Sequence, residues 1–574
     1  MRMGAEVRLD HYNMVGTQEI RGTLNIDRPV TGYSFADYML GIISGTRSAG
    51  ALGEGWYRAT SQSYFFQDTW RARPNLTFDA GLRYEYTPPW TDVKGQLMNM
   101  WIPPGFGTPS QQGQPCFVRV GSGDPYEGVA TRFDPAICVT RDGRLGDRLV
   151  QADKTNVAPR IGVVWSPTPK MTVRTGYGIF YAQDTTNAVF DMSRNIQGRI
   201  TSQSAGLTFA QPYTGGSTNP CGVQMPPQVC VTAPQVLANQ YDRRTPLVEQ
   251  YLLNVQREVL GSMAVEVGYF GSRGHRLQRF VTLNQPVPGL SDPIQARAPA
   301  PELGNWQLLS SLGHSTYNSL AAKVTRRLSN GLSGLLSYTW SKSMDNGSGV
   351  RSPGTDSLKP QKGDCPECEW GRSVYDVRHR LVGSFIYELP VGSGRTYLPQ
   401  GGVLNALIGG WQIGGMMRMS SGFPLTVTSG VDQSRTAHGY DRPNVVPGID
   451  PNLPAGQHNA SQWFNVAAFQ MNALGTFGNL GRNTLTGPGV FVIDFSTLKN
   501  FNFAGKYLQL RIEAFNLLNR PNFGDPVTNL AQSNWNAAGN NGIPTPGSGA
   551  FGTINSTRGT VPMRQLQFAL KFVF

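Results

Sequence analysis

Length, composition and charge narrow the classes of protein to which this chain can belong. At 574 residues it is too long for one ordinary soluble core, so a soluble protein would need several domains, whereas one membrane barrel can take up the whole chain. No window approaches about 18 uninterrupted apolar residues, which excludes a transmembrane helix. The formal charge is +13, but the basic residues are scattered, so we expect no nucleic-acid partner.

The composition favours an all-β chain. Its 68 glycines, 40 prolines and 10% aromatic residues are typical of many turns and many aromatic strand positions. The mean hydropathy of −0.29 does not separate a soluble protein from a membrane barrel, because lipid-facing residues of barrel strands alternate with polar ones. Residues 1–10 lack the apolar core of a secretion signal and already alternate as a strand does, so we expect the chain to begin inside a structural element.

Strands with a two-residue alternation of apolar and polar side chains recur along the chain. We interpret residues 1–10 and 17–26 as the first two strands, and the first regular hairpin joins 56–70 to 75–86. Further hairpins are expected at 156–166 with 171–181, 246–259 with 262–271, 314–328 with 332–343, 374–389 with 411–421, and 490–501 with 507–519. With a closing strand at 564–574, the count is about fifteen strands.

Short turns alternate with long connections through this series. The turns at 71–74, 167–169, 260–261 and 329–331 are short, whereas Pro/Gly-rich stretches such as 87–154 separate the hairpins. Outer-membrane barrels have short periplasmic turns at one rim and long extracellular loops at the other, so the sequence predicts a transmembrane, antiparallel up-and-down β-barrel. Single-chain bacterial barrels have an even number of strands, so the odd count predicts further wall strands before Met1.

The two faces of these strands fit a membrane wall. In 507–516, Leu508, Leu510 and Ile512 share one parity, and Arg511 and Glu513 share the other, so the charges fall on the face that can be wet. We also expect an aromatic girdle near the strand ends, although ordinary β-propensity is an alternative reason for aromatic residues there. The girdle residues are Tyr84, Tyr86, Tyr181, Tyr338, Trp340, Tyr387 and Trp411.

The last strand has one fully apolar parity and ends on it. Leu566, Phe568, Leu570, Phe572 and Phe574 form this parity, and a strand of about 9–11 residues is long enough to cross a bilayer at a tilt. We interpret it as the strand that closes the barrel and that the barrel-assembly machinery recognises. The alternative is the last core strand of a soluble all-β domain.

Six cysteines form three pairs, each within one long connection. An even number suits an oxidising compartment, and confinement to single loops favours disulfides between Cys116 and Cys138, Cys221 and Cys230, and Cys365 and Cys368. The alternative for the last pair is half of a zinc or redox site, but no second cysteine pair or histidine at metal spacing accompanies it. Without a catalytic or phosphate-binding motif, we expect neither an enzyme nor a bound metal or cofactor.

Longer motifs occur in collinear order over almost the whole chain. They are Ser337-Tyr-Thr-Trp-Ser-Lys-Ser343, Asp376-Val-Arg-His-Arg380 before Tyr387-Glu-Leu-Pro390, Gly410-Trp-Gln-Ile413 with Ser421-Gly-Phe-Pro424, Trp463-Phe-Asn465, Gly475-Thr-Phe-Gly478 with Gly481-Arg-Asn483, and Arg511-Ile-Glu-Ala-Phe-Asn-Leu-Leu-Asn-Arg-Pro-Asn-Phe523. Together with the closing strand, they resemble the barrel of Oar-like TonB-dependent outer-membrane receptors of the acidobacterial type.

This resemblance implies a domain order and a function. In that family the barrel has about 22 strands and follows a secretion signal, a carboxypeptidase-regulatory-like β-domain and a plug that fills the lumen. Residues 1–574 are therefore expected to be a partial outer-membrane β-barrel domain without those three N-terminal parts. The resemblance implies a receptor and transporter in a Gram-negative outer membrane, which binds a large solute through its extracellular loops and conducts its uptake into the periplasm.

The expected partners and the alternatives follow from the same resemblance. The partners are outer-membrane lipid, the barrel-assembly machinery, the TonB complex through the N-terminal parts, and a solute that is a siderophore, a glycan or a peptide. The alternatives are a passive pore or adhesin, a non-functional fragment of a receptor, and a soluble binding protein. A plug encoded upstream decides against the passive pore, and extraction without detergent supports the soluble protein.

Overall fold

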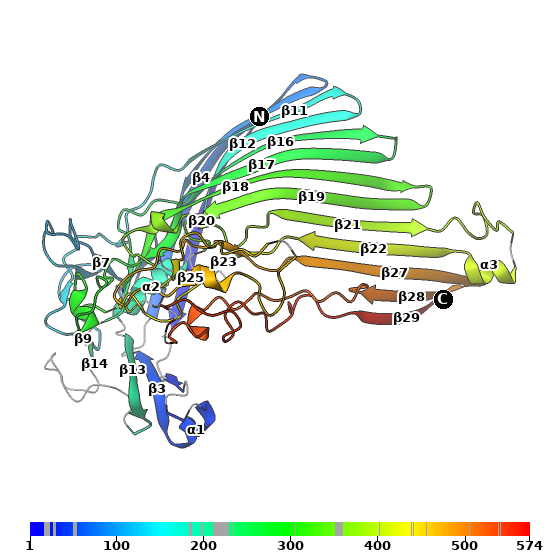
Figure 1. The fold of residues 1–574 in the computed structure, drawn as a ribbon. Coiled ribbons are helices and arrows are strands. Elements are labelled where there is room, and N and C mark those ends of the chain that lie inside the picture. The colour runs from blue at the N-terminus through cyan, green and yellow to red at the C-terminus, as the bar shows by residue number, and fades with distance from the viewer. Residues whose placement is uncertain are drawn as a thin grey trace.

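The computed structural model is a large curved antiparallel sheet with folded connections at one end (Figure 1). It describes residues 1–574 except 16–22, 27–29, 32, 50–53, 183–185, 197–198, 211–228, 232–233, 305, 350–359, 401, 438, 440, 455, 504–505, 538 and 540. The expected all-β, up-and-down antiparallel architecture is confirmed.

The principal sheet has 17 strands in the described residues. Three are short: β6 (Thr91–Asp92), β15 (Val236–Asn239) and β20 (Gly371–Arg372). The other fourteen form the wall, and each pairs antiparallel with the next wall strand along the chain. They are β1 (Arg2–Val15), β4 (Glu54–Arg73), β5 (Leu76–Tyr86), β11 (Val157–Thr168), β12 (Met171–Tyr181), β16 (Leu247–Val259), β17 (Met263–Val281), β18 (Trp306–Ser329), β19 (Leu332–Asp345), β21 (His379–Glu388), β22 (Trp411–Ser420), β27 (Val490–Phe503), β28 (Lys506–Phe515) and β29 (Gln565–Val573).

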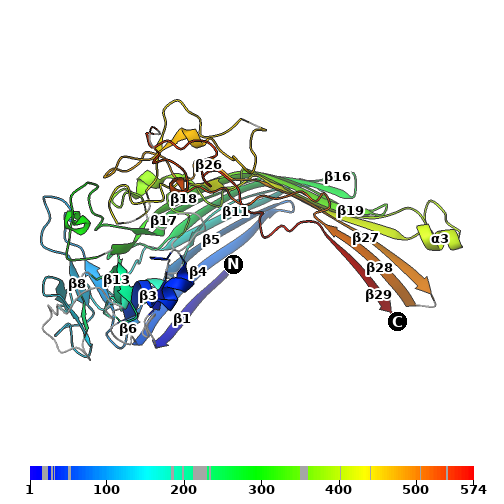
Figure 2. The same ribbon diagram turned by 60° about the horizontal axis from the view of Figure 1, so that its bottom comes forward.

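The wall is open between its two outermost strands (Figure 2). In the described pairings β1 contacts only β4, and β29 contacts only β28. The count of fourteen wall strands is close to the predicted fifteen. The difference lies near the N-terminus, where 17–26 was expected to be the second strand.

The prediction for 17–26 is wrong for its described part. Within it, β2 (Thr23–Asn25) pairs with β3 (Ile42–Ala49) in a separate small sheet, and the partner of β1 is β4. The physical reason is length, because a three-residue strand cannot pair along the 14 residues of β1. The 20 residues of β4 match β1 along its whole length.

The short-turn rim follows local sequence preferences. Asn330 and Gly331, which join β18 to β19, both have positive φ, of 50° and 76°. This is the combination that a two-residue hairpin turn needs, and Asn-Gly adopts it at low cost. A Cβ on Gly331 would lie 2.7 Å from the carbonyl oxygen of Glu388, so close packing also requires glycine there.

The long connections carry the remaining elements. The helices are α1 (Ser34–Met39), α2 (Thr186–Ile196) and α3 (Val403–Ile408), with 3-10 turns η1 (Ile294–Arg297), η2 (Pro366–Glu369), η3 (Val466–Ala468) and η4 (Leu530–Gln532). The small sheets contain β13 (Arg199–Thr208) with β3 and β2; β7 (Met98–Trp101), β8 (Cys116–Arg119) and β10 (Cys138–Thr140); β9 (Thr131–Phe133) and β14 (Val229–Val231); β23 (Pro424–Leu425) and β26 (Leu485–Thr486); and β24 (Asn444–Val445) and β25 (Phe469–Gln470). None of the described helices is long and apolar enough to cross a membrane.

The buried apolar cores lie at the long-loop rim rather than along the wall. One surrounds Trp306 and Phe117, a second contains Phe464 and Phe469, and a third surrounds Tyr57. We call the folded region at this rim the loop cap, and it consists of the described residues of 87–156, 182–246, 282–305, 346–378, 421–489 and 516–564. The sequence predicted long connections but not that they pack into cores of their own.

Candidate functional site

The wall has one apolar and one polar face, and the strand register carries both across the sheet. In β28 and β29, Ile512 lies opposite Phe568, and the next pair is Glu513 with Gln567. Residues that face each other across an antiparallel pair point to the same side, so each such pair extends one face by one strand. The pairings from β1 to β29 keep this alternation.

The apolar face forms a band across the middle of the strands. In β16 its parity carries Tyr251, Leu253 and Val255 in the centre, with Glu249 and Arg257 toward the two ends. A charge at the bilayer midplane of such a face costs about 2–4 kcal/mol and much less near the interfaces. This distribution is therefore what a bilayer requires of a lipid-facing surface.

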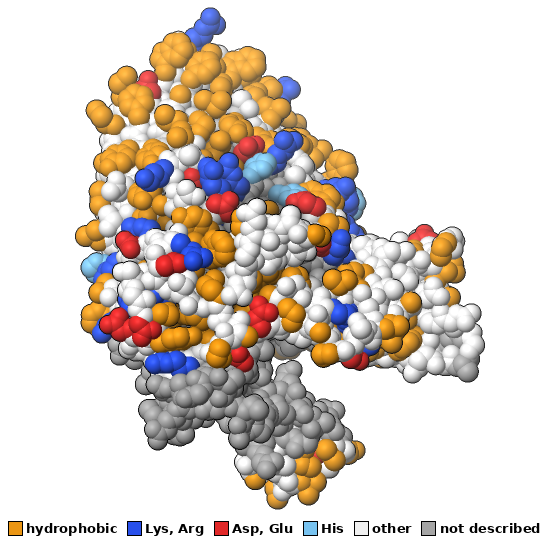
Figure 3. Space-filling model, turned by 90° about the vertical axis from the view of Figure 1, so that its left-hand side faces the viewer, with side chains coloured by type: hydrophobic (Ala, Val, Ile, Leu, Met, Phe, Trp, Pro, Cys, Tyr) orange, Lys and Arg blue, Asp and Glu red, His pale blue; other side chains and the backbone are white. Residues whose placement is uncertain are grey.

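The polar face carries charges of both signs. They include Glu6, Arg8, Asp79, Arg83, Glu85, Arg160, Arg174, Glu266, Lys323, Arg380, Arg418, Asp494, Arg511, Glu513 and Lys571. Arg83 lies 2.6 Å from Glu85 in the same strand and 3.5 Å from Glu6, so one of the two ion pairs connects β5 to β1 across the intervening strand β4. Figure 3, viewed from the loop end, shows hydrophobic side chains predominating at the top, where wall strands lie, and charged ones interspersed below.

A recess on the polar face has a volume of about 460 Å³ and lies beside the short-turn rim. Its walls include four basic side chains, Lys170, Arg174, Lys323 and Arg327, and two acidic ones, Glu258 and Glu266. The Lys323 ammonium lies 3.6 Å from the Glu266 carboxylate, and Arg174 donates to Gln256 at 3.0 Å. The recess is therefore a polar surface with excess positive charge.

The seven girdle residues all lie on the apolar-face parity. Tyr84, Tyr86, Tyr181, Tyr338 and Trp340 lie toward the long-loop ends of their strands, and Tyr387 and Trp411 lie beside the short-turn rim. Their polar atoms bond to nearby groups, as when the Tyr338 hydroxyl and His379 Nδ1 approach to 2.8 Å and Trp411 Nε1 donates to the Leu407 carbonyl at 3.1 Å. Their role as a girdle stays a prediction.

The closing strand lies at the edge of the wall with its apolar parity uncovered. Leu566, Phe568, Leu570, Phe572 and Phe574 are exposed by 48% to 90%. Their strand pairs on one side with β28, and the described residues provide no partner for its other side. Recognition of this strand by assembly machinery stays a prediction.

Two of the three predicted cysteine pairs are joined in the described structure. A disulfide links Cys116 to Cys138 across the parallel strands β8 and β10, and another links Cys365 to Cys368 around η2. Cys221 lies outside the described residues, and the side chain of Cys230 in β14 is not described either. Among the described residues, no group of three or more His, Cys, Asp or Glu could hold a metal ion.

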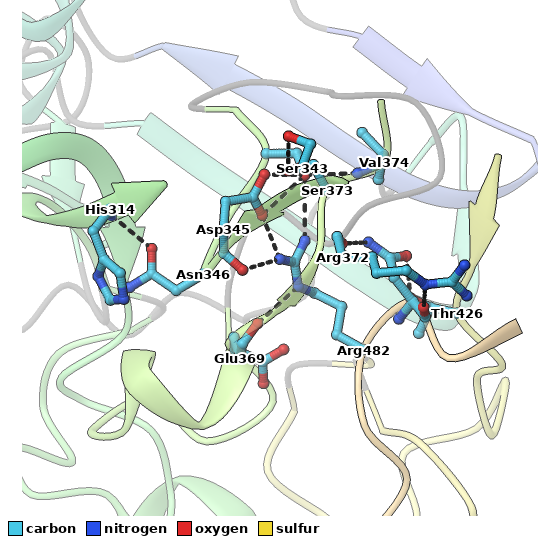
Figure 4. Close-up of polar contacts among 12 residues, drawn as sticks. His314, Ser343, Asp345, Asn346, Glu369, Arg372, Ser373, Val374, Thr426 and Arg482 are labelled. Carbon is cyan, nitrogen blue, oxygen red and sulfur yellow. Dashed lines mark hydrogen bonds and ion pairs between the residues drawn. The ribbon is translucent and has the colours of Figure 1, made fainter. Parts of the chain in front are cut away.

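The most ordered polar feature of the loop cap is a buried ionic network, drawn in Figure 4. Arg482, whose side chain is 2% exposed, pairs with the Asp345 carboxylate at the end of β19. The same guanidinium donates to the Asp345 carbonyl at 2.6 Å and to the Glu369 carbonyl at 3.0 Å. One side chain thus joins the 421–489 connection to the end of β19 and to η2 in the 346–378 connection.

A second buried ion pair continues this network. Arg442 donates two hydrogen bonds to the Glu369 carboxylate, at 2.6 and 2.9 Å, and a third to the Leu480 carbonyl at 2.8 Å. The Gln361 N–H also donates to Glu369 at 3.1 Å. Burial alone raises the pKa of Glu369, but the Arg442 hydrogen bonds and charge outweigh it, so its pKa is lowered and the carboxylate stays ionised.

Arg372 adds a third link across the same two connections. Its guanidinium donates to the Asn483 carbonyl at 3.0 Å and to the Thr486 hydroxyl at 2.9 Å, and Asn483 Nδ2 donates back to the Arg372 carbonyl at 2.6 Å. The sequence predicts a strand over 374–389, which includes Val374 and Arg378. The strand starts instead at His379, because the preceding backbone turns to meet this network, with the Ser343 N–H donating to Asp376.

A separate ion pair, between Asp153 and Arg244, joins the first two long connections, and we call it the latch. Arg244 Nε donates to the Asp153 carboxylate at 3.0 Å, and the Thr245 N–H donates to it at 3.0 Å. Burial raises the pKa of Asp153, but hydrogen bonds from Thr155, Arg244 and Thr245 outweigh burial and lower the pKa to about 2. The carboxylate therefore stays charged and holds the two connections together at neutral pH.

Sequence reasoning missed these network residues because no periodicity joins them. Arg482 and Asp345 are 137 positions apart, and Arg442 and Glu369 are 73 apart. One signal was available, because Arg482 and Asn483 belong to the Gly481-Arg-Asn483 motif and Asp376 begins another motif. These motif residues hold loops together through buried polar contacts.

Comparisons with solved structures give low similarity over much of the chain. The FrpB iron transporter from Neisseria meningitidis is 12% identical with a TM-score of 0.36, and the match covers 83% of this chain and 43% of that one. The outer membrane transporter YddB from Escherichia coli is 9% identical with a TM-score of 0.38, and the match covers 88% of this chain and 53% of that one. The siderophore receptor PiuA from Acinetobacter baumannii is 10% identical with a TM-score of 0.37, and the match covers 91% of this chain and 44% of that one.

The chain spans about half the length of these solved structures. No curated protein sequence matches it closely enough to count as a relative. A family model described as an outer membrane beta barrel domain matches residues 1–567. Because that match spans nearly the whole chain, the protein is located in the outer membrane and belongs to the outer membrane beta barrel domain family.

Proposed function

We propose that this chain is the wall and loop cap of a TonB-dependent outer-membrane receptor, which binds a large solute at the cap and passes it to the periplasm. The observation that carries the proposal is the buried network of Arg482, Asp345, Glu369 and Arg442. A passive pore needs only a wall, whereas rigid loops with fixed geometry reduce the entropy lost when a ligand is bound. Membership of the barrel family supports the membrane context of this proposal.

The polar wall face supports the second half of the proposal. Its charged side chains, including the basic recess around Lys170 and Lys323, offer hydrogen bonds and ion pairs to a plug domain or to a solute on its way inward. The Oar-like resemblance of the motifs supports a plug and a TonB-binding segment outside residues 1–574. Under this proposal the solute is a siderophore, a glycan or a peptide.

The closing strand has its own part in the proposal. The uncovered apolar parity from Leu566 to Phe574 would be the segment that the barrel-assembly machinery reads, because it combines an unpaired strand edge with a row of large apolar side chains. After insertion the same side chains face outer-membrane lipid, and the seven girdle residues lie near the two interfaces.

The genomic reading frame upstream of Met1 tests the proposal. An in-frame extension that encodes a plug domain and a TonB-binding segment is the expected result. A stop codon and a promoter immediately before Met1 would contradict uptake by this product. A planar-bilayer recording of the native product separates the alternatives, because a receptor closed by its plug shows little conductance and a passive pore conducts steadily.

A further inference from the structure

The connection between β21 and β22 differs from the other described connections at the short-turn rim. Two residues suffice at Pro169-Lys170 and at Asn330-Gly331, but here the chain runs through 389–410 and forms the helix α3. Between Arg395 and Arg418 the sequence has no Asp, Glu, Lys, Arg or His. Figure 1 places α3 at the tip of the wall, beyond the ends of β22 and β27.

The helix α3 leaves its apolar side chains uncovered. Val403 is 80% exposed, Leu404 57%, Leu407 62% and Ile408 45%. Four large apolar side chains on six residues are far more than a solvent-exposed turn needs, and their exposure to water costs free energy roughly in proportion to their area. A partner that removes this surface from water is therefore expected.

The helix is fixed to the wall from the lipid-facing side. Lys499 and Trp411 both have the apolar-face parity, and they lie opposite each other in β27 and β22. The Lys499 ammonium donates to the Leu407 carbonyl at 3.1 Å and also to the Gly409 carbonyl, and Trp411 Nε1 donates to the Leu407 carbonyl. The Lys499 side chain is almost fully buried beneath this connection, and its charge is matched by the carbonyls at the end of α3.

We propose that α3 inserts Val403, Leu404, Leu407 and Ile408 into the acyl chains of glycerophospholipids, in the membrane leaflet nearest the short-turn rim. The occupant follows from continuity, because the atoms that hold α3 belong to the lipid-facing side of the wall and the connection carries no charge for 22 positions, 396–417. Short apolar helices at an interface bind lipid through their buried apolar area. The proposal depends on the membrane location and not on transport.

Fluorescence quenching by brominated phosphatidylcholine tests this assignment. The full chain carrying Leu404→Trp is reconstituted into vesicles with plain or brominated acyl chains, and its emission in excess of the wild type is compared. We expect this excess to fall at least twofold in brominated vesicles. The matched control is Leu474→Trp, since Leu474 is exposed to a similar degree, 54%, but lies in the loop cap, and its excess should not change.

A second position and a second quencher keep the test decisive. Leu407→Trp should repeat the result if Leu404→Trp disturbs folding, which far-ultraviolet circular dichroism monitors. Excess emission that brominated chains do not quench, but that aqueous iodide reaches, would overturn the proposal. Emission shielded from both quenchers would place protein, such as a second copy of this chain, against α3 and would overturn it as well.

Discussion

The wall and the loop cap are stabilised in opposite ways. Wall strands such as β29 are paired through their backbones, but their apolar side chains stay exposed, with Phe568 at 69%. The loop cap has little regular pairing and instead buries Phe464, Phe469 and the ion pair between Arg442 and Glu369. A wall of this kind completes its apolar burial only in a bilayer, whereas the cap completes its own in water.

Under the proposed function, this difference gives the two regions different tasks. A lipid-dependent wall tolerates any sequence that keeps the alternation, so it encodes location more than specificity. A cap with cores and buried charges holds a fixed shape, and shape is what recognition of a solute requires. Substitutions that change one region at a time should therefore affect that region and leave the other intact.

Replacement of Arg482 by Met should destabilise the cap and leave the wall intact. It leaves the buried Asp345 carboxylate without its cation, and breaking a buried pair in this way costs about 3–5 kcal/mol. Hydrogen–deuterium exchange should rise in 346–378 and 421–489 while β27 and β28 keep their protection. Arg395→Met is the control, because its pair with Glu388 is partly exposed and is worth less than about 1 kcal/mol. Equal exchange in both variants would show that the network is not what holds the cap.

A charge on the apolar face should have the reverse effect, destabilising the wall alone. Phe568→Arg in β29 is expected to lower the free energy of unfolding in lipid vesicles by about 2–4 kcal/mol, since the arginine would face acyl chains. The adjacent Gln567→Arg places the same charge on the polar face and should change it by less than about 1 kcal/mol. Denaturant titration measures both variants. Similar losses for the two would contradict the assignment of faces.

Loss of the disulfide between Cys116 and Cys138 should loosen a smaller part of the cap. The bridge closes a segment with a sequence separation of 22, and such a bridge is typically worth about 3 kcal/mol. Replacement of both cysteines by serine should increase protease cleavage within 116–138 and leave cleavage around Arg482 unchanged. Cleavage that spreads through the whole cap would show that its cores are one cooperative unit.

Acid should weaken the latch between Asp153 and Arg244 over a defined range. The pKa of Asp153 is about 2 in the folded protein and about 4 in an unfolded chain, so the carboxylate stabilises the cap above pH 4. That contribution is lost as the pH falls from about 4 to 2. Exchange rates in 150–156, corrected for intrinsic rates, should rise over this range in the wild type. In the Asp153→Asn variant these exchange rates should already be high at pH 6, and they should show no further rise between pH 4 and 2.

The sequence was sufficient for the wall because one local rule produces it. Alternation in 75–86 and 171–181 gave strands that the structure places within one residue, at Leu76–Tyr86 and Met171–Tyr181. The rule failed in the described part of 17–26, where Thr23–Asn25 pairs with β3 and the partner of β1 is β4. Observed strand boundaries also differ from the predicted ones where side-chain hydrogen bonds hold the backbone in a turn, as in the residues before His379.

The cap could not be predicted in the same way, because its contacts are long-range and aperiodic. Nothing near Arg442 in the sequence points to Glu369, and the apolar residues of the cap are spaced irregularly between glycines and prolines. The anchoring of α3 by Lys499 could not be predicted from the sequence either. Its role depends on carbonyls that only the fold brings to it.

Spin-label accessibility along β28 tests the central claim, a wall with lipid on one face and water on the other. Single cysteines are introduced at each position of 507–514 in a background with Cys221 and Cys230 replaced by serine. Collision with oxygen should be highest at Leu508, Leu510 and Ile512, and collision with a water-soluble nickel chelate should be highest at Gln509, Arg511 and Glu513. Accessibilities that rise and fall together, without the two-residue period, would contradict the account.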